Sequence, residues 1–213
     1  IGSGLVGSEM CKETEIVLTP ERIFLFDIQD KKILLFTRRG KFITDIRPHG
    51  REPGEWLGIT DFTVDETDRE IIVTADRPYK FLYYDYNGNF LREKTSEAFY
   101  TEITRTTDNI LAINSKVLEP KHYLSLLNEE DHRITVAKKI PLAFTYRGEF
   151  RCRGSYLLKS EHLYFTQNGD YTIYSWDNNR IKPVVTVDFG KYSYNPTQLN
   201  EEPLSLIHIS EPT

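Results

Sequence analysis

The sequence has little that could build a disulfide, zinc or redox site. Only two cysteines, Cys11 and Cys152, occur in 213 residues, and neither belongs to a Cys-x-x-Cys pair. A zinc ribbon or a dithiol redox motif therefore has no support. We expect both cysteines to be small buried residues or free thiols, because a disulfide would require their Cα atoms to come within about 7 Å.

Other absences exclude further classes of function. No run of about 18 apolar residues is present, so no membrane-spanning helix is predicted. The 27 basic and 32 acidic residues are interspersed and give a net charge of −5, which leaves no basic footprint for nucleic acid. The sequence contains no Gly-x-Ser-x-Gly, His-Glu-x-x-His or Gly-x-x-x-x-Gly-Lys. Without these motifs, we predict no catalytic residue and no cofactor.

The residues that are abundant favour β-strands. The chain has 13 Tyr and 12 Phe but a single Met, and aromatic side chains are enriched in strands. No apolar period of 3.6 residues continues beyond two helical turns. The sequence therefore predicts an all-β fold.

A pattern of strands repeats along the chain. Residues 22–27 and 32–37 are predicted strands, and Arg39-Gly40 turns the chain into a third strand. The pattern returns 48 residues later, where Asn87-Gly88 takes the place of Arg39-Gly40. An Asn-Gly pair between alternating apolar runs is a strong hairpin signal. Gly40 and Gly88 are therefore predicted to occupy equivalent turns.

Four such units are predicted, each with one more strand before the group of three. These first strands lie at 15–19, 60–65, 102–106 and 155–159. Four strands in roughly 44–48 residues are typical of a β-propeller blade. A β-sandwich would not give Gly40 and Gly88 the same role one period apart. The predicted blades span residues 12–47, 55–96, 100–141 and 153–190, with a fifth beginning at 191–203.

The joint between the first two predicted blades reads His49-Gly50-Arg51-Glu52-Pro53-Gly54-Glu55-Trp56 and continues to Asp61-Phe62-Thr63-Val64-Asp65. Its glycines and proline break any regular element. Charged side chains on a shaped loop often contact ligands, so the candidate ligand-binding residues are Arg51, Glu52, Glu55 and Trp56. In the alternative interpretation, Arg51 pairs with a carboxylate that braces the blades and Trp56 packs under the loop.

This joint, together with Phe26-Asp27, Leu35-Phe36 and Gly40-Lys41-Phe42-Ile43, resembles the NHL-like six-bladed β-propeller proteins of Bacteroidota. The family's joint typically reads Gly-x-Gly-Pro-Gly-Glu-aromatic, whereas this chain has Arg51-Glu52 where the family has a second glycine. The resemblance is clear over 15–95, fair over 100–190 and absent after 203. It implies an exported protein of unknown role, often a lipoprotein, located in the periplasm or at the cell surface.

Six blades would need about 270 residues at this period, so the chain is expected to be a fragment holding about four of them. The whole protein is expected to be a monomer. The fragment is expected to be poorly soluble or oligomeric, because missing blades would expose two apolar blade faces.

The last ten residues, 204–213, are similar to the translation of a sequencing adaptor. We predict that they are a non-native tail, which leaves 1–203 as the propeller fragment. The alternative is a short native tail.

The function predicted from these features is non-catalytic binding of a protein, peptide or glycan by loops at one end of the propeller. The alternative is a lactonase-like propeller hydrolase or lyase with a channel metal, which would need carboxylates from several innermost strands. The carboxylates expected there, Glu15, Asp61, Asp65 and Glu102, do not recur at one position of the repeat. The histidines are scattered as well, so no metal ligand is predicted.

Overall fold

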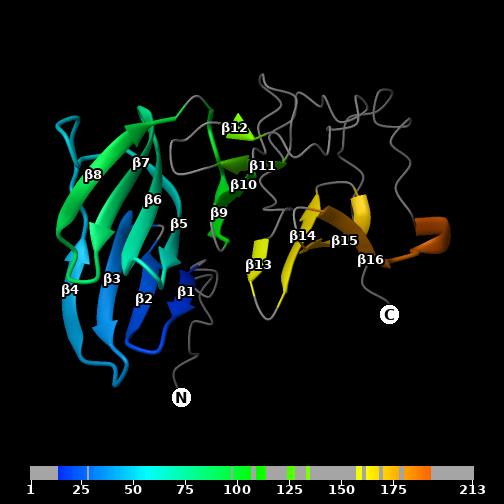
Figure 1. The fold of residues 1–213 in the computed structure, drawn as a ribbon, viewed down its shortest axis with the longest axis horizontal. Helices are drawn as coiled ribbons and strands as arrows, with labels where there is room; N and C mark the ends of the chain where they lie inside the picture. Colours follow the sequence, from blue (N-terminus) through cyan, green and yellow to red (C-terminus); the bar gives the residue numbers. More distant parts are fainter. Residues whose placement is uncertain are drawn as a thin grey trace, which may run out of the picture. The chain divides into compact units, whose positions relative to one another are not determined.

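The described chain is built from β-strands and short turns (Figure 1). The computed structural model describes residues 14–27, 29–96, 98–106, 109–113, 124–127, 133–134, 157–159, 162–167, 170–177 and 180–192. Within these ranges no α-helix occurs, and one 3₁₀ turn, η2 (Gly190–Tyr192), follows the last strand. Both cysteines and the predicted tail at 204–213 lie outside the described residues.

The strands form four sheets, each made of four strands that are consecutive in the sequence. The first sheet contains β1 (Thr14–Leu18), β2 (Arg22–Asp27), β3 (Lys32–Thr37) and β4 (Phe42–Ile46). The second contains β5 (Ile59–Asp65), β6 (Glu70–Asp76), β7 (Tyr79–Asp85) and β8 (Phe90–Thr95). The third contains β9 (Glu102–Arg105), β10 (Ile110–Ile113), β11 (Leu124–Leu127) and β12 (Arg133–Ile134). The fourth contains β13 (Leu157–Lys159), β14 (Leu163–Gln167), β15 (Asp170–Asp177) and β16 (Arg180–Thr186).

In every sheet each strand lies beside its neighbour in sequence, which is the meander of a propeller blade. The predicted equivalence of β3 and β7 is confirmed, because each is the third strand of its own sheet rather than the other's neighbour. A sandwich built on that repeat is thereby excluded. The chain has an all-β, β-propeller fold.

The turns that set this repeat depend on glycine. Gly40 has φ +81° and Gly88 has φ +83°, a region that L-residues with a Cβ rarely adopt. Each glycine N–H donates back to a strand carbonyl, from Gly40 to Thr37 at 2.9 Å and from Gly88 to Asp85 at 3.0 Å. The two turns are therefore equivalent, as their 48-residue separation predicts.

The described strands fall into two compact units, the first holding the first three sheets and the second holding the fourth. In the first unit, the second sheet packs on both of its faces. Alternate residues of a strand point to opposite faces, and on β6 the side chains of Ile71 and Val73 join the first sheet's core while Ile72 joins the third's. On β7, the side chains of Leu82 and Tyr84 join the first sheet's core, while that of Phe81 joins the third's.

This two-sided packing explains why β6 and β7 read as continuous apolar runs rather than as alternating ones. It also gives the unit a core in two layers. The layer between the first and second sheets includes Phe24, Phe26, Ile33, Leu35, Trp56, Phe62 and Val64. The layer between the second and third sheets includes Tyr100, Ile103, Ile110, Ala112 and Leu127.

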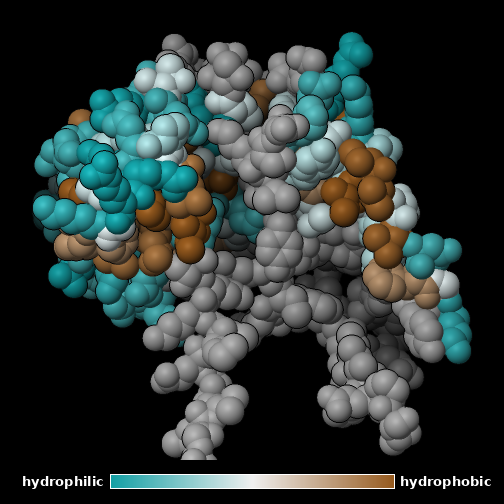
Figure 2. Space-filling model, turned by 90° about the horizontal axis from the view of Figure 1, so that it is seen from below, coloured by the Kyte–Doolittle hydropathy of each residue, from teal (hydrophilic) through white to brown (hydrophobic). Residues whose placement is uncertain are grey.

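In the second unit the last strand is shorter than predicted. Residues 180–189 are predicted as one strand, but β16 ends at Thr186. Val187 still donates its N–H to the Tyr171 carbonyl at 2.9 Å, after which the Asp188 carboxylate accepts the Gly190 N–H at 2.7 Å and begins η2. Along this edge the exposed apolar side chains are those of Val184, Val185, Val187 and Phe189. Figure 2 shows apolar groups at the surface of both units.

Candidate functional site

The joint connects β4 to β5 over residues 47–58, and its own backbone closes it. His49 and Trp56 form an isolated β-bridge. The Gly50 N–H donates to the Trp56 carbonyl at 3.1 Å, and the Glu55 N–H donates to the Glu52 carbonyl at 2.9 Å. The segment between them is therefore a short closed loop with defined geometry, which we call the joint loop (residues 49–56).

Inside the joint loop, Glu55 fixes the turn from its own side chain. Its Oε2 accepts the Glu52 N–H at 3.0 Å. The same oxygen lies 1.8 Å from where a Cβ at Gly50 would stand, so no larger residue fits there without moving the carboxylate. Glu55 thus satisfies a main-chain donor of the loop. This role holds the loop in shape, which differs from the ligand contact that the sequence suggests.

Gly54 anchors the loop to the second sheet through both of its backbone polar groups. Its N–H donates to Glu93 Oε2 at 2.9 Å, and its carbonyl accepts the Tyr84 hydroxyl at 2.8 Å. Lys80 Nζ, in a side chain that is 5% exposed, donates to the same Glu93 oxygen at 2.8 Å. A backbone amide, a carboxylate and an ammonium group therefore form one connected network under the loop.

Electrostatics keep Glu93 and Tyr84 in the protonation states that the contacts to Gly54 require. Burial raises the pKa of Glu93, but hydrogen bonds from Lys80 and the Gly54 N–H, with the charge of Lys80, outweigh burial and lower it. Burial, with the nearby Glu93 charge, raises the pKa of Tyr84. At neutral pH Glu93 is an acceptor and Tyr84 a donor, as the contacts to Gly54 require.

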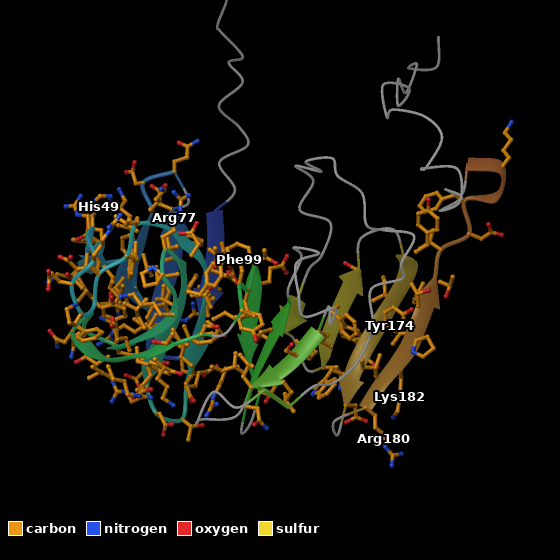
Figure 3. All side chains as sticks on the ribbon, turned by 90° about the horizontal axis from the view of Figure 1, so that it is seen from above. His49, Arg77, Phe99, Tyr174, Arg180 and Lys182 are labelled. Atoms are coloured by element: carbon orange, nitrogen blue, oxygen red, sulfur yellow. The ribbon has the colours of Figure 1, made fainter. Side chains whose placement is uncertain are left out.

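Trp56 lies beneath the joint loop and is only 1% exposed. Its ring meets that of Tyr84 edge-on, with centroids 6.0 Å apart. The indole is thus part of the core between the first and second sheets, and this agrees with the alternative interpretation of that residue. By contrast, Arg51 and Glu52 are exposed at the loop tip. His49 is exposed as well, and Figure 3 shows it at the periphery of this unit.

Replacing Gly54 with alanine should destabilise the chain by about 1–3 kcal/mol. Gly54 has φ +83°, and a Cβ there would stand 3.0 Å from the Phe90 ring. The left-handed conformation alone costs an L-residue about 1–2 kcal/mol. Gly40→Ala is the matched control, because its φ is +81° and nothing lies within 4 Å of the added Cβ. Urea unfolding should show a larger loss for Gly54→Ala, and equal losses would mean that the Phe90 contact adds nothing.

A second polar arrangement links the first strands of the second and third sheets. Side chains at alternate positions of β5 face β9. Asp61 Oδ2 accepts the Ile103 N–H at 2.7 Å, Thr63 Oγ1 accepts the Arg105 N–H at 3.0 Å, and Asp65 Oδ2 pairs with Arg105 Nε. These side chains accept hydrogen bonds from β9, which is the edge strand of the third sheet.

The structure corrects the prediction that inner-strand carboxylates do not recur at one position. Glu15 of β1 pairs with Phe26, and Asp61 of β5 pairs with Thr74. Phe26 and Thr74 are 48 residues apart, one full repeat, so Glu15 and Asp61 occupy equivalent places. The equivalence was hidden because the stretch from Asp61 to Thr74 is two residues longer than the stretch from Glu15 to Phe26. Only the register of the strands reveals it.

No metal centre emerges from the residues that the structure describes. Among them, no group of three or more His, Cys, Asp or Glu side chains is arranged to hold a metal ion. Of the five histidines in the sequence, the described ones are His49 in the joint loop and His162 beside Tyr164 in the second unit. In this described part there is also no helix long and apolar enough to cross a bilayer.

Solved structures of low sequence identity share the fold. A candidate exported protein from Bacteroides fragilis NCTC 9343 aligns with a TM-score of 0.65 at 19% identity, over 80% of this chain and 49% of that one. A member of the DUF4221 family from Bacteroides vulgatus ATCC 8482 aligns with a TM-score of 0.59 at 12% identity, over 84% of this chain and 58% of that one. This chain thus spans about half the length of these structures. Among curated proteins no match is found.

The family comparison covers almost the whole chain. The model of a domain of unknown function, DUF4934, matches residues 9–210. The match extends past residue 203, so the predicted boundary of a non-native tail is not confirmed, and neither is the NHL-like assignment. Since the match covers far more than half of the sequence, the chain belongs to the DUF4934 family.

Proposed function

We propose that this protein is a non-catalytic recognition module that binds a protein, peptide or glycan with loops at one end of its propeller. The observation that carries the proposal is the construction of the joint loop. Its backbone is held by Glu93, Tyr84 and its own Glu55, while charged side chains at its tip stay exposed. Polar side chains on a rigid loop can bind a ligand with little loss of conformational entropy.

The four candidate residues take different parts in this proposal. Arg51 and Glu52 contact the ligand, because they are exposed at the tip. Glu55 and Trp56 position them, the first through the Glu52 N–H and the second by filling the core below. A guanidinium beside a carboxylate offers both donors and acceptors, which suits the hydroxyl groups of a glycan or the backbone of a peptide.

Location in the periplasm or at the cell surface is part of the same proposal. The likeness to a candidate exported protein of Bacteroides fragilis supports it. A six-bladed, monomeric whole protein also remains a proposal. It is compatible with a chain that spans 49% and 58% of the similar structures.

The alternative, a propeller hydrolase or lyase with a channel metal, rests on the carboxylates of the inner strands. The recurrence of Glu15 and Asp61 brings two of them to equivalent positions. The described residues nevertheless offer no three-ligand group. Elemental analysis of the purified protein separates the two proposals, since a stoichiometric divalent cation would favour the enzyme.

Binding should depend on the loop tip. We expect an Arg51→Ala/Glu52→Ala variant to lose at least about tenfold in affinity, as one lost charge-assisted contact is worth ~1.5–3 kcal/mol. The measurement is a screen of the chain against a glycan array and a peptide-display library, followed by titration of the hits. Arg39→Ala/Lys41→Ala is the control, because it removes exposed charges from the turn between β3 and β4 of the first sheet. Equal losses in both variants, or none in either, would contradict the proposal.

A further inference from the structure

β5, the first strand of the second sheet, holds a carboxyl group with an unusual environment, that of Asp61. Asp61 is 6% exposed, so its side chain is almost completely removed from water. One of its oxygens accepts the Ile103 N–H of β9, and its carboxyl group also hydrogen-bonds that of Glu15 on β1. Asp61 is therefore the side chain through which the first strands of three consecutive sheets meet.

A hydrogen bond between two carboxyl groups requires a proton, because an ionised carboxylate has no donor. The groups around Asp61 do not stabilise two ionised carboxylates in place of the shared proton. Glu15 of β1 and Glu102 of β9 both act on Asp61 with like charge, and Thr74, its partner on β6, is uncharged. The cation on β9, Arg105, is paired with Asp65.

We infer that Glu15 and Asp61 share one proton in the folded protein, and that this proton makes the junction of the first three sheets sensitive to pH. Burial first, then the charge of Glu15 and the hydrogen bond with it, raise the pKa of Asp61 well above its usual range, although the Ile103 N–H opposes them. The proton belongs to the pair, since two interacting carboxyl groups titrate together.

The direction of the pH effect follows from where the proton is held. The unfolded chain releases it near pH 4, the ordinary value for Asp. The folded chain still holds it above that pH, so the folded state binds more protons. The free energy of unfolding therefore falls as the pH rises above about 4, and it stops falling once the folded pair is itself ionised. Within that window the folding equilibrium constant falls up to about tenfold per pH unit.

The test uses the 213-residue chain and two variants. Asp61→Asn keeps an acceptor for the Ile103 N–H and gains an N–H donor for Glu15, so it needs no shared proton. We expect urea unfolding from pH 4.5 to 8.5 to show that wild type loses stability relative to Asp61→Asn as the pH rises. Glu52→Gln, at an exposed position of the joint loop, should follow wild type. Identical pH profiles for wild type and Asp61→Asn would overturn the inference.

A second measurement does not depend on the stability of Asp61→Asn. The amide shift of Ile103 in NMR spectra should report the titration of its carboxyl acceptor, with a midpoint well above 4. Glu15→Gln, which alters an exposed residue and supplies a permanent donor, should lower that midpoint. A midpoint near 4 in wild type, or one unchanged by Glu15→Gln, would show that no proton is shared.

Discussion

Replacing Trp56 with alanine should lower the free energy of unfolding by about 3–5 kcal/mol, the usual cost of deleting a fully buried Trp or Phe side chain. Trp56 is 1% exposed and lies in the layer between the first and second sheets. The deletion removes its edge-on contact with Tyr84 and leaves a cavity under the joint loop. Urea unfolding followed by circular dichroism measures the loss.

Phe42→Ala is the comparison for Trp56→Ala, because Phe42 is also aromatic but is 52% exposed on β4. Its deletion should cost less than about 1.5 kcal/mol, since it removes little buried area. Similar losses in the two variants would show that the joint loop is not packed on its tryptophan. In that case Trp56 would be free to contact a ligand, as the sequence alone allows.

Trp56→Ala also bears on binding. Tyr84, which touches the indole, donates to the carbonyl of Gly54, so a cavity here would loosen the anchor of the loop. We expect the variant to weaken binding of any ligand held by Arg51 and Glu52 even where the protein stays folded. The loss would come from positioning, because the indole itself is buried.

The sheets could be predicted from the sequence because their signals are local. β2 and β3 are each an apolar run with one polar residue at either end, as predicted, and the glycines at 40 and 88 mark turns that require positive φ. Strand ends that no turn glycine marks are harder to predict from the sequence. β16 ends earlier than its apolar run because Asp188 caps η2. The run of Val and Phe residues does not indicate this contact.

The candidate site was predicted less completely because its contacts span tens of residues. The joint loop is visible in its Gly and Pro pattern, but nothing in that pattern indicates that Glu93, 39 residues from Gly54, accepts its N–H. The pairing of Asp61 with Glu15 depends on strand register and on turns of different length. Such contacts become visible only when the sheets are aligned in space.

Removing the buried ion pair between Asp65 and Arg105 is the second change expected to have a large effect on stability. The Asp65 side chain is 5% exposed and that of Arg105 is 11% exposed. Arg105→Met should cost about 3–5 kcal/mol, because it leaves an uncompensated buried charge. We expect a value near the lower end, since Asp65 Oδ1 keeps the N–H groups of Thr67 and Asp68.

The cost of Arg105→Met should also depend on pH. Burial raises the pKa of Asp65, but the Asp68 N–H, the charge of Arg105 and the Thr67 N–H together lower it below its ordinary value. A lowered pKa means that the ionised group stabilises the fold above about pH 4 and that this contribution is lost as the pH falls. The difference between wild type and Arg105→Met should thus be largest near pH 7 and shrink below pH 4.

Arg69→Met provides the matched control for Arg105→Met. Arg69 pairs with Glu21 at 2.6 Å and also links two consecutive sheets, but its side chain is 55% exposed and that of Glu21 is 48% exposed. Solvent and salt screen such a pair, so its loss should cost no more than about 1 kcal/mol. Urea unfolding of both variants at pH 7 and pH 3.5 decides the comparison. If Arg105→Met proved as mild as Arg69→Met at pH 7, water would reach Asp65. The polar contacts between β5 and β9 would then contribute little to holding the second and third sheets together.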